Sequence, residues 1–295
     1  MDIFQLRYFI SATTLGSFSL AATENNISQS SFSKQIMALE HELGVTLFSR
    51  KRRVISLTPA GHCFLDHAYA ILNNYNKMKA DLAKFTANDR ATISIAAIPV
   101  ITQYRIIDAI IEYRALRPQV AFSLTEAESS QVMSVLRKME ADFAIMRTDF
   151  LDPTQYHISP LVEDRLVALV STNHPLAQRD RIPLSALRDE TLTMATVYSD
   201  LHKIVLNACL KAGFTPNVGV TVSGRTDITF DIVRKGEAIC LAMEKVMANY
   251  PPDGCKLVEL EEDILSTTAL VWLKAVELSP ACRLFRDFLM VHMHP

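Results

Sequence analysis

The sequence predicts an α/β protein with an all-α-type N-terminal part. Residues 17–61 have the pattern of a winged helix-turn-helix, and residues 59–88 carry one long helical repeat. From residue 92 onwards, short apolar runs alternate with helical ones, as a mixed α/β part requires. A chain of 295 residues is long enough for roughly two or three domains, each with its own core.

The first two helices are expected to be short and to cross closely. Gly16 can end the first helix in a left-handed conformation, and we expect Ser19 to cap the second. The small side chains of Ala21 and Ala22 allow two helices to approach each other. Asn25-Asn26 follows as a turn, because asparagine tolerates backbone angles that most residues resist.

The third helix has one apolar face and one polar face. Its apolar residues recur at helical spacing, at Phe32, Ile36, Leu39 and Leu43. We expect Ser28 to cap this helix, which places Gln29, Ser30 and Ser33 at its exposed amino-terminal end, with Lys34 just beyond. In helix-turn-helix proteins, this end of the second helix of the motif enters the major groove of DNA.

Basic residues follow this helix. The run Arg50-Lys51-Arg52-Arg53 precedes the β-prone segment Val54–Leu57. Cations beside a strand are typical of a wing lying along DNA phosphates, where each neutralised phosphate releases a counterion. A solvated charge run and an ordinary core helix are the alternatives, and the order of the patterns favours DNA. The predicted DNA contacts are Ser28, Gln29, Ser30, Ser33, Lys34, Arg50 and Arg53.

These residues resemble those of the LysR-type transcriptional regulators. The matching residues are Phe4-Gln5-Leu6-Arg7-Tyr8-Phe9, Gly16-Ser17-Phe18, Ala21-Ala22, Ser28-Gln29, Ser33-Lys34-Gln35-Ile36, Leu39-Glu40, Leu43-Gly44-Val45, Leu47-Phe48, Arg50 and Leu57-Thr58-Pro59-Ala60-Gly61. The resemblance implies a DNA-binding domain over residues 1–58, double-stranded promoter DNA as partner, no catalysis and no cofactor. The chain departs from the family pattern at Ser30, Ser31, Phe32, Lys34 and Arg52, so we expect its base preference to differ from that of its relatives.

A long helix is expected after the wing. Thr58 can cap it, and Pro59 suits the first helical position. Apolar residues then recur every 3.5 residues on average, at Phe64, Ala68, Ile71, Tyr75, Met78, Leu82 and Phe85. A repeat with this period favours a partner helix, and a core helix within one domain is the alternative. The family resemblance implies that residues 59–88 are a linker helix that dimerises, so the expected assembly is either a homodimer or a homotetramer built as a dimer of dimers.

The remaining residues are expected to alternate strands and helices. The predicted strands are residues 93–98, 120–125, 143–146, 166–170, 218–222, 238–241 and 268–273, and the predicted helices are residues 104–116, 130–139, 201–212, 228–234 and 281–291. The family resemblance implies a two-lobed, periplasmic-binding-protein-like (type II) effector domain over residues 91–295. Lobe I would span about residues 91–162 and 268–295, and lobe II about 163–267, with crossovers near 161–164 and 263–267.

A small-molecule effector would bind between the lobes. Carried over by position from the family, its contacts are Ile98, Pro99, Val100, Ser129, Arg147, Thr196, Ser199, Arg225 and Thr226. Family members that bind small carboxylates often have Ser or Thr where this chain has Ile98, so an effector with an apolar portion is favoured. Arg147 and Arg225 are candidates for binding a carboxylate, and surface ion pairs are the alternative for both.

Charge and composition restrict the function further. Residues 1–90 carry a net charge of +3 and residues 91–295 a net charge of −5, so DNA binding is assigned to the first part. No apolar stretch is long enough for a membrane span and no signal pattern is present, so we expect a cytoplasmic chain with no membrane partner. RNA polymerase is a further candidate partner. The five cysteines and eight histidines lack the spacing of a disulfide framework or metal site.

The sequence fits two other classes of protein, enzymes and secreted solute-binding proteins, less well. The eight glycines form no dinucleotide or phosphate loop, and no serine lies in a nucleophile elbow, so the sequence carries no catalytic constellation. A secreted solute-binding protein would explain two lobes, but it would explain neither the missing signal peptide nor the first 60 residues. The sequence therefore favours a transcriptional regulator with an effector-binding domain.

Overall fold

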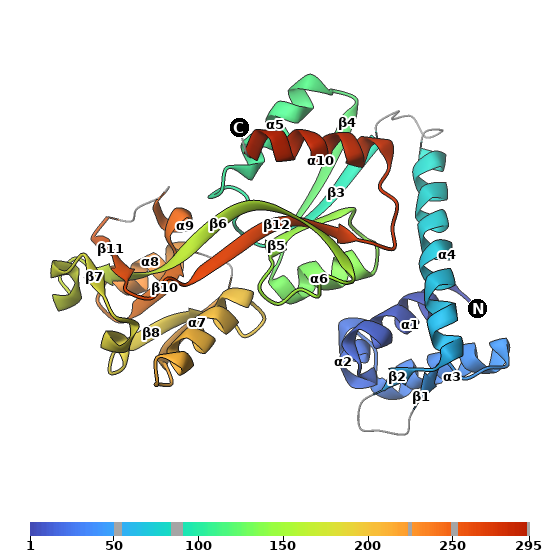
Figure 1. The fold of residues 1–295 in the computed structure, drawn as a ribbon, viewed down its shortest axis with the longest axis horizontal. Coiled ribbons are helices and arrows are strands. Elements are labelled where there is room, and N and C mark those ends of the chain that lie inside the picture. Colours follow the sequence, from blue (N-terminus) through green and yellow to red (C-terminus); the bar gives the residue numbers. More distant parts are fainter. Residues whose placement is uncertain (50–54, 84–90, 224–225, 249–252, 294–295) are drawn as a thin grey trace.

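The predicted fold class is confirmed by the computed structural model, which describes residues 1–49, 55–83, 91–223, 226–248 and 253–293 (Figure 1). A helical N-terminal part is followed by the long helix α4 and by a mixed α/β part. Helix α4 leads from the N-terminal part toward the α/β part, and the strands β6 and β12 run side by side through the latter (Figure 1).

Three helices and a two-stranded ribbon form the N-terminal part. They are α1 (Ile3–Leu15), α2 (Phe18–Glu24), α3 (Gln29–Leu43), β1 (Phe48–Ser49) and β2 (Ser56–Leu57), and the two strands pair antiparallel. Buried apolar side chains from all three helices and from β1 form one core, which includes Leu6, Phe9, Ile10, Ala21, Ala22, Phe32, Ile36, Leu39 and Phe48. Leu43, expected on the same face as Phe32, is instead 36% exposed because it lies in the last turn of α3.

The helix ends follow the local rules with one correction. Gly16 ends α1 in a left-handed conformation with φ of 60°, as predicted, and Asn26 also has a positive φ of 55°. The prediction that Ser19 caps α2 is wrong. Ser17 has extended backbone and its hydroxyl accepts from the Leu20 amide, so α2 already contains Ser19.

Helix α4 (Pro59–Ala83) begins where the sequence places it. The Thr58 hydroxyl accepts from the Gly61 amide at 3.0 Å, and Pro59 occupies the first helical position. The expected end of this helix, near residue 88, lies outside the described residues.

The α/β part contains ten strands within the described residues. The strands are β3 (Ala91–Ala97), β4 (Val120–Glu126), β5 (Phe143–Arg147), β6 (Tyr156–Ser171), β7 (Arg181–Ile182), β8 (Thr191–Ala195), β9 (Asn217–Val222), β10 (Ile239–Met243), β11 (Cys255–Leu260) and β12 (Leu265–Leu273). They pair in the order β4-β3-β5-β12-β6-β10-β8-β9, with β11 on β6 and β7 on β11. The helices are α5 (Ile106–Leu116), α6 (Ser129–Arg137), α7 (Asp200–Lys211), α8 (Thr226–Arg234), α9 (Glu244–Ala248) and α10 (Pro280–Met293).

The two lobes are joined by strands. Within the segments where the sequence predicts crossovers, β6 runs continuously through residues 161–164 and β12 starts inside residues 263–267. The two strands pair antiparallel from Leu265 opposite Arg165 to Leu273 opposite Tyr156. The charged residues of β6 between Leu161 and Leu166 interrupt the apolar pattern, although pairing with β12 satisfies their backbone groups.

Short or mixed elements account for the other differences. The strands β8 and β11 were missed because Thr191–Ala195 and Cys255–Leu260 lack a continuous apolar run. Helix α5 begins two residues later than expected because Arg105 has a left-handed φ of 59°. No helix in the described part of the chain is long and apolar enough to cross a membrane.

Candidate DNA-binding and effector sites

The amino-terminal end of α3 is exposed and polar. Ser28 caps the helix as predicted, since its hydroxyl accepts from the Ser31 amide at 3.1 Å. This hydroxyl also lies 2.9 and 3.0 Å from the hydroxyls of Ser31 and Ser30. Gln29, Ser30 and Lys34 are exposed, and Ser33 is half-buried. Ser28 is therefore already engaged in capping, while Gln29, Ser30 and Lys34 are exposed to solvent.

A contact between α2 and α3 positions Gln29. The Ser19 hydroxyl donates to the Gln29 side-chain oxygen at 2.9 Å. The link restrains the amide on the outer surface of the helix pair, where it can reach a base edge.

A buried carboxylate positions the wing. Glu40 of α3 accepts the backbone N–H groups of Leu47 at 2.7 Å and Phe48 at 3.1 Å, and it is only 8% exposed. The residue fixes the start of β1 against α3. The predicted phosphate contacts Arg50 and Arg53 lie outside the described residues.

The predicted dimerisation residues divide into two groups. Phe64 packs on Phe9 of the chain's own core, with 4.9 Å between ring centroids, and Ala68 is completely buried there. The prediction that Ala68 faces a partner helix is therefore wrong, because α1 packs against this part of α4. Exposed apolar residues further along α4 are Ile71, Met78 and Leu82. Tyr75 is half-buried, and Phe85 lies outside the described residues.

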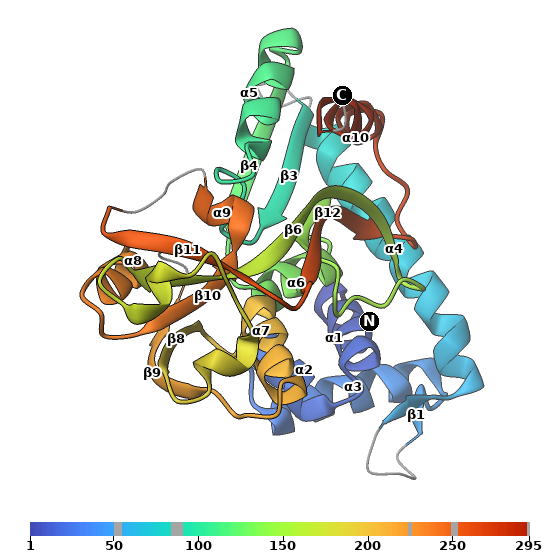
Figure 2. The same cartoon turned by 60° about the vertical axis from the view of Figure 1, so that its left-hand side comes forward.

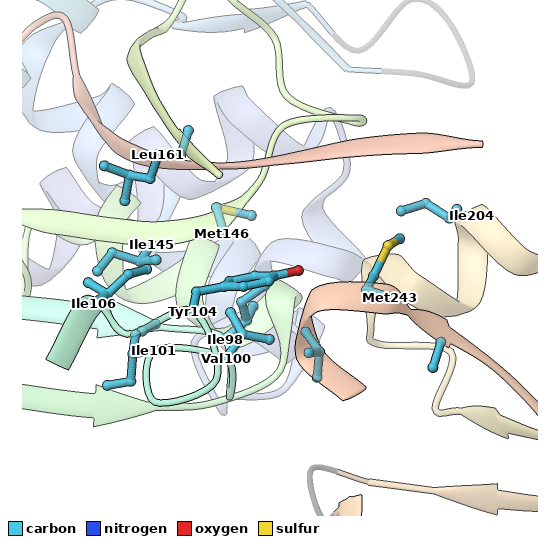
Figure 3. Close-up of a cluster of buried hydrophobic side chains, with 14 of the residues drawn as sticks. Ile98, Val100, Ile101, Tyr104, Ile106, Ile145, Met146, Leu161, Ile204 and Met243 are labelled. Carbon is cyan, nitrogen blue, oxygen red and sulfur yellow. The ribbon is translucent and has the colours of Figure 1, made fainter. Parts of the chain in front are cut away.

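Apolar side chains gather where the two lobes meet. Ile98 and Val100 of lobe I are buried, and Pro99 is half-buried. Figure 3 shows Tyr104 lying near Ile98, with its hydroxyl pointing toward Met243 of lobe II.

Hydrogen bonds join the lobes beside these residues. The hydroxyl of Ser129, in the first turn of α6, accepts from the Asp200 amide at 3.1 Å. The Ser130 amide donates to the Tyr198 carbonyl at 3.3 Å. The structure thus brings the predicted residue Ser129 to the loop that contains Thr196 and Ser199. Ser199 is the N-cap of α7 without a side-chain bond, and the buried Thr196 hydroxyl has no partner within the described residues.

Arg147, at the end of β5, is buried rather than at the surface. Its exposure is 4%, so the alternative of a surface ion pair is wrong for this residue. Its Nη1 atom has no hydrogen-bond partner among the residues that the structure describes. Arg225 lies outside those residues, as does the side chain of Thr226.

A buried polar network that the sequence did not indicate lies next to Arg147. The Tyr104 hydroxyl donates to Asp164 at 2.9 Å, and Asp164 also accepts from the Lys245 amide at 3.0 Å. Burial raises the pKa of Tyr104 to about 12, while the adjacent Arg147 opposes this shift and Asp164 adds to it. A cavity of about 300 Å³ borders the network, lined by Gln103, Tyr104, Arg105, Val162, Lys245 and Ala248. Asp164 falls in a predicted crossover, so no sequence pattern marked it as buried.

Family comparisons cover both parts of the chain. Residues 3–62 match the family described as bacterial regulatory helix-turn-helix protein, lysR family, and residues 86–293 match the LysR substrate binding domain. The chain belongs to the LysR family of transcriptional regulators. LysR regulators bind promoter DNA and small-molecule effectors and are not enzymes, so this part of the prediction is confirmed.

Individual relatives agree with this assignment. The chain is 28% identical over 294 residues to the transcriptional dual regulator GltC of Bacillus subtilis, covering 98% of this chain and 97% of GltC. It is 32% identical over 221 residues to the regulator AlsR of the same organism, covering 74% of this chain and 72% of AlsR.

Solved structures show the same fold. A full-length OxyR variant from Pseudomonas aeruginosa matches with a TM-score of 0.60 and 23% identity, covering 98% of this chain and 94% of that chain. The CcmR regulatory domain from Synechocystis, in complex with 2-PG, matches with a TM-score of 0.63 and 20% identity, covering 70% of this chain and 98% of that domain.

In this LysR regulator, Glu40→Ala is expected to loosen the wing. The change leaves two buried N–H groups without their acceptor, which costs about 1–3 kcal/mol for each group. We expect faster hydrogen exchange at Leu47 and Phe48 and weaker binding to all duplexes alike. The matched control is Glu42→Ala, which removes only an exposed contact to the N-terminal amine. Equal exchange rates at these two amides in both variants would contradict the role of Glu40.

Proposed function

We propose that this LysR regulator binds promoter DNA as a homodimer or a dimer of dimers, and that its effector is a small carboxylate with an apolar portion. The proposed domains are residues 1–58 for DNA, 59–88 for dimerisation and 91–295 for the effector. The proposed location is the cytoplasm, where RNA polymerase is a candidate partner.

The amino-terminal end of α3 supports the assignment of DNA contacts. It combines exposed polar side chains with a helix start, where backbone N–H groups favour phosphate. Gln29 can bind adenine bidentately, and Ser30 and Ser33 can reach base edges or phosphates. Lys34, Arg50 and Arg53 would bind phosphates of the DNA backbone.

The single observation that carries the effector proposal is Arg147. A buried guanidinium nitrogen without a hydrogen-bond partner costs free energy, and a carboxylate oxygen would satisfy it. The unpartnered hydroxyl of Thr196 supplies a second donor from lobe II. Ile98 and Met243, which flank Tyr104, would contact the apolar portion.

Gln29→Ala is expected to relax base preference at one position. It should cost about 1–3 kcal/mol on a duplex selected from random sequence by the wild-type protein, and little on a random duplex. Lys34→Ala is the matched control, because loss of a phosphate contact weakens both duplexes alike and reduces the salt slope by about one. Fluorescence anisotropy measures both affinities. Equal losses of affinity for the two duplexes in Gln29→Ala would contradict the proposal that Gln29 reads a base.

Leu82→Lys is expected to weaken the dimer. Leu82 is 55% exposed, and a charge at that position would have to be buried against a partner helix. Sedimentation velocity should show the dimer Kd raised about tenfold or more, or about 1.4 kcal/mol. The control is Asn74→Lys on an exposed polar position of the same helix. A dimer Kd as low as that of the wild type in Leu82→Lys would place the interface elsewhere.

Small carboxylic acids that carry an aliphatic or aromatic group are expected to bind between the lobes, whereas the corresponding carboxamides are not. At a hundredfold excess over its Kd, an acid stabilises the protein by about 2.7 kcal/mol, which thermal unfolding detects. Arg147→Met should remove the effect, and Arg147→Lys, which keeps the charge, should retain part of it. The proposal fails if acids and amides stabilise equally or if Arg147→Met responds like the wild type.

A further inference from the structure

Helix α6 has one end in the inter-lobe contact and the other at the DNA-binding part. Its first residue, Ser129, accepts from the Asp200 amide of lobe II. The side chain of its N-cap Glu128 accepts from the Ser223 hydroxyl, also of lobe II, at 2.9 Å. The helix ends at Arg137, about 12 Å from Ser129 at 1.5 Å per residue.

Each residue of the segment 137–140, here called the docking turn, contacts either the N-terminal part or helix α4. Arg137 forms an ion pair with Glu24 of α2, and the two side chains are only 10% and 8% exposed. The Lys138 ammonium donates to the Glu24 carbonyl at 2.8 Å. The remaining partners are Asn76 of α4, which donates to the Met139 carbonyl at 3.1 Å, and Arg7 of α1, which pairs with Glu140 at 3.0 Å.

Apolar packing continues through the same contact. Tyr69 of α4 and Met139 of the docking turn each pack against both the N-terminal core and the core of the α/β part. Figure 2 shows α6 close to α1 and α2. The docking turn is therefore joined to the DNA-binding part by buried charge and by shared apolar contacts.

Glu24 is connected to the proposed base-reading residue. It is the last residue of α2, and its carboxylate also accepts from Ser11 of α1. Ser19, earlier in α2, donates to the Gln29 side chain of α3. A displacement of Glu24 thus acts on the helix that restrains Gln29.

We propose that α6 couples the cleft to the DNA-binding part: a change in the lobe contact at Ser129 moves α6, and its docking turn then moves α2 through Glu24. The helix is short and hydrogen-bonded throughout, so its two ends move together. The buried ion pair resists separation, because loss of one partner leaves an uncompensated buried charge. The coupling is a free energy shared by two sites, so it must act in both directions.

Hydrogen exchange on the full-length protein tests this proposal without DNA or effector. Ser129→Ala removes the acceptor of the Asp200 amide, which is one of the hydrogen bonds between α6 and lobe II. It is expected to raise exchange about fivefold at residues 18–25, which Ser129 does not touch. The matched control is Ser130→Ala, because Ser130 is exposed and its backbone amide, not its side chain, makes the lobe contact. The control should leave the hydrogen-exchange rates of residues 18–25 as they are in the wild-type protein.

The reverse experiment uses the other end of the helix. Glu24→Gln, which leaves the Arg137 charge unpaired, is expected to raise exchange at the Asp200 amide of lobe II by a similar factor. Glu237→Gln, an exposed change in lobe II, is the control. Faster exchange confined to α6 and the mutated end in both variants would overturn the proposal.

The inference rests on the proposed function in one respect: it takes the cleft to be the effector site that α6 connects to the DNA-binding part. If no carboxylate binds, the exchange experiment still decides whether the two ends of α6 are coupled. If the exchange experiment fails while acids bind at Arg147, the effector site stands and α6 is not its route to the DNA.

Discussion

The pairing of β6 with β12 is the constraint on which the rest of the structure depends. Both strands pass from one lobe to the other and are joined by nine residue pairs, with one register shift between Thr268 and Ala269. Separating the strands would leave buried backbone groups unpaired, so we expect the lobes to change their angle by bending or twisting this strand pair. The contacts across the cleft, such as Ser129 with Asp200, are the parts free to change. An effector between the lobes therefore acts by selecting among a few angles rather than by reorganising the sheet.

Two sets of polar groups beside the β6–β12 strand pair differ in whether their hydrogen bonds are satisfied. Asp164 lies on β6 and accepts from the Tyr104 hydroxyl and from the Lys245 amide at the start of α9, so it ties lobe II to lobe I near the hinge. Arg147 has a buried nitrogen that remains unpartnered within the described residues. The first network is satisfied and stiffens the hinge, whereas the second offers binding free energy to an anion. Their proximity places the proposed effector where a small shift in lobe angle alters its contacts.

Local signals account for what the sequence predicts well. Gly16, Ser28 and Pro59 act within one turn of a helix, and each lies where the pattern places it. The errors arise where distant parts of the chain decide the outcome. Ala68 fits a heptad seam but is buried in the N-terminal core, to which α1 also contributes. Glu24 and Arg137 are 113 residues apart in sequence, and neither lies in a pattern that marks it as a contact.

A double-mutant cycle on DNA affinity tests the central claim, that the cleft and the DNA-binding part are linked through α6. Ser129→Ala and Glu24→Gln are combined, and binding is measured on a duplex selected by the wild-type protein. Changes at distant sites with no shared partner usually add within about 0.3–0.5 kcal/mol. Coupling through α6 predicts an interaction free energy of about 1 kcal/mol, because both changes loosen contacts of the same helix and the second therefore has a smaller effect than it has alone. Losses that add within experimental error would contradict the account.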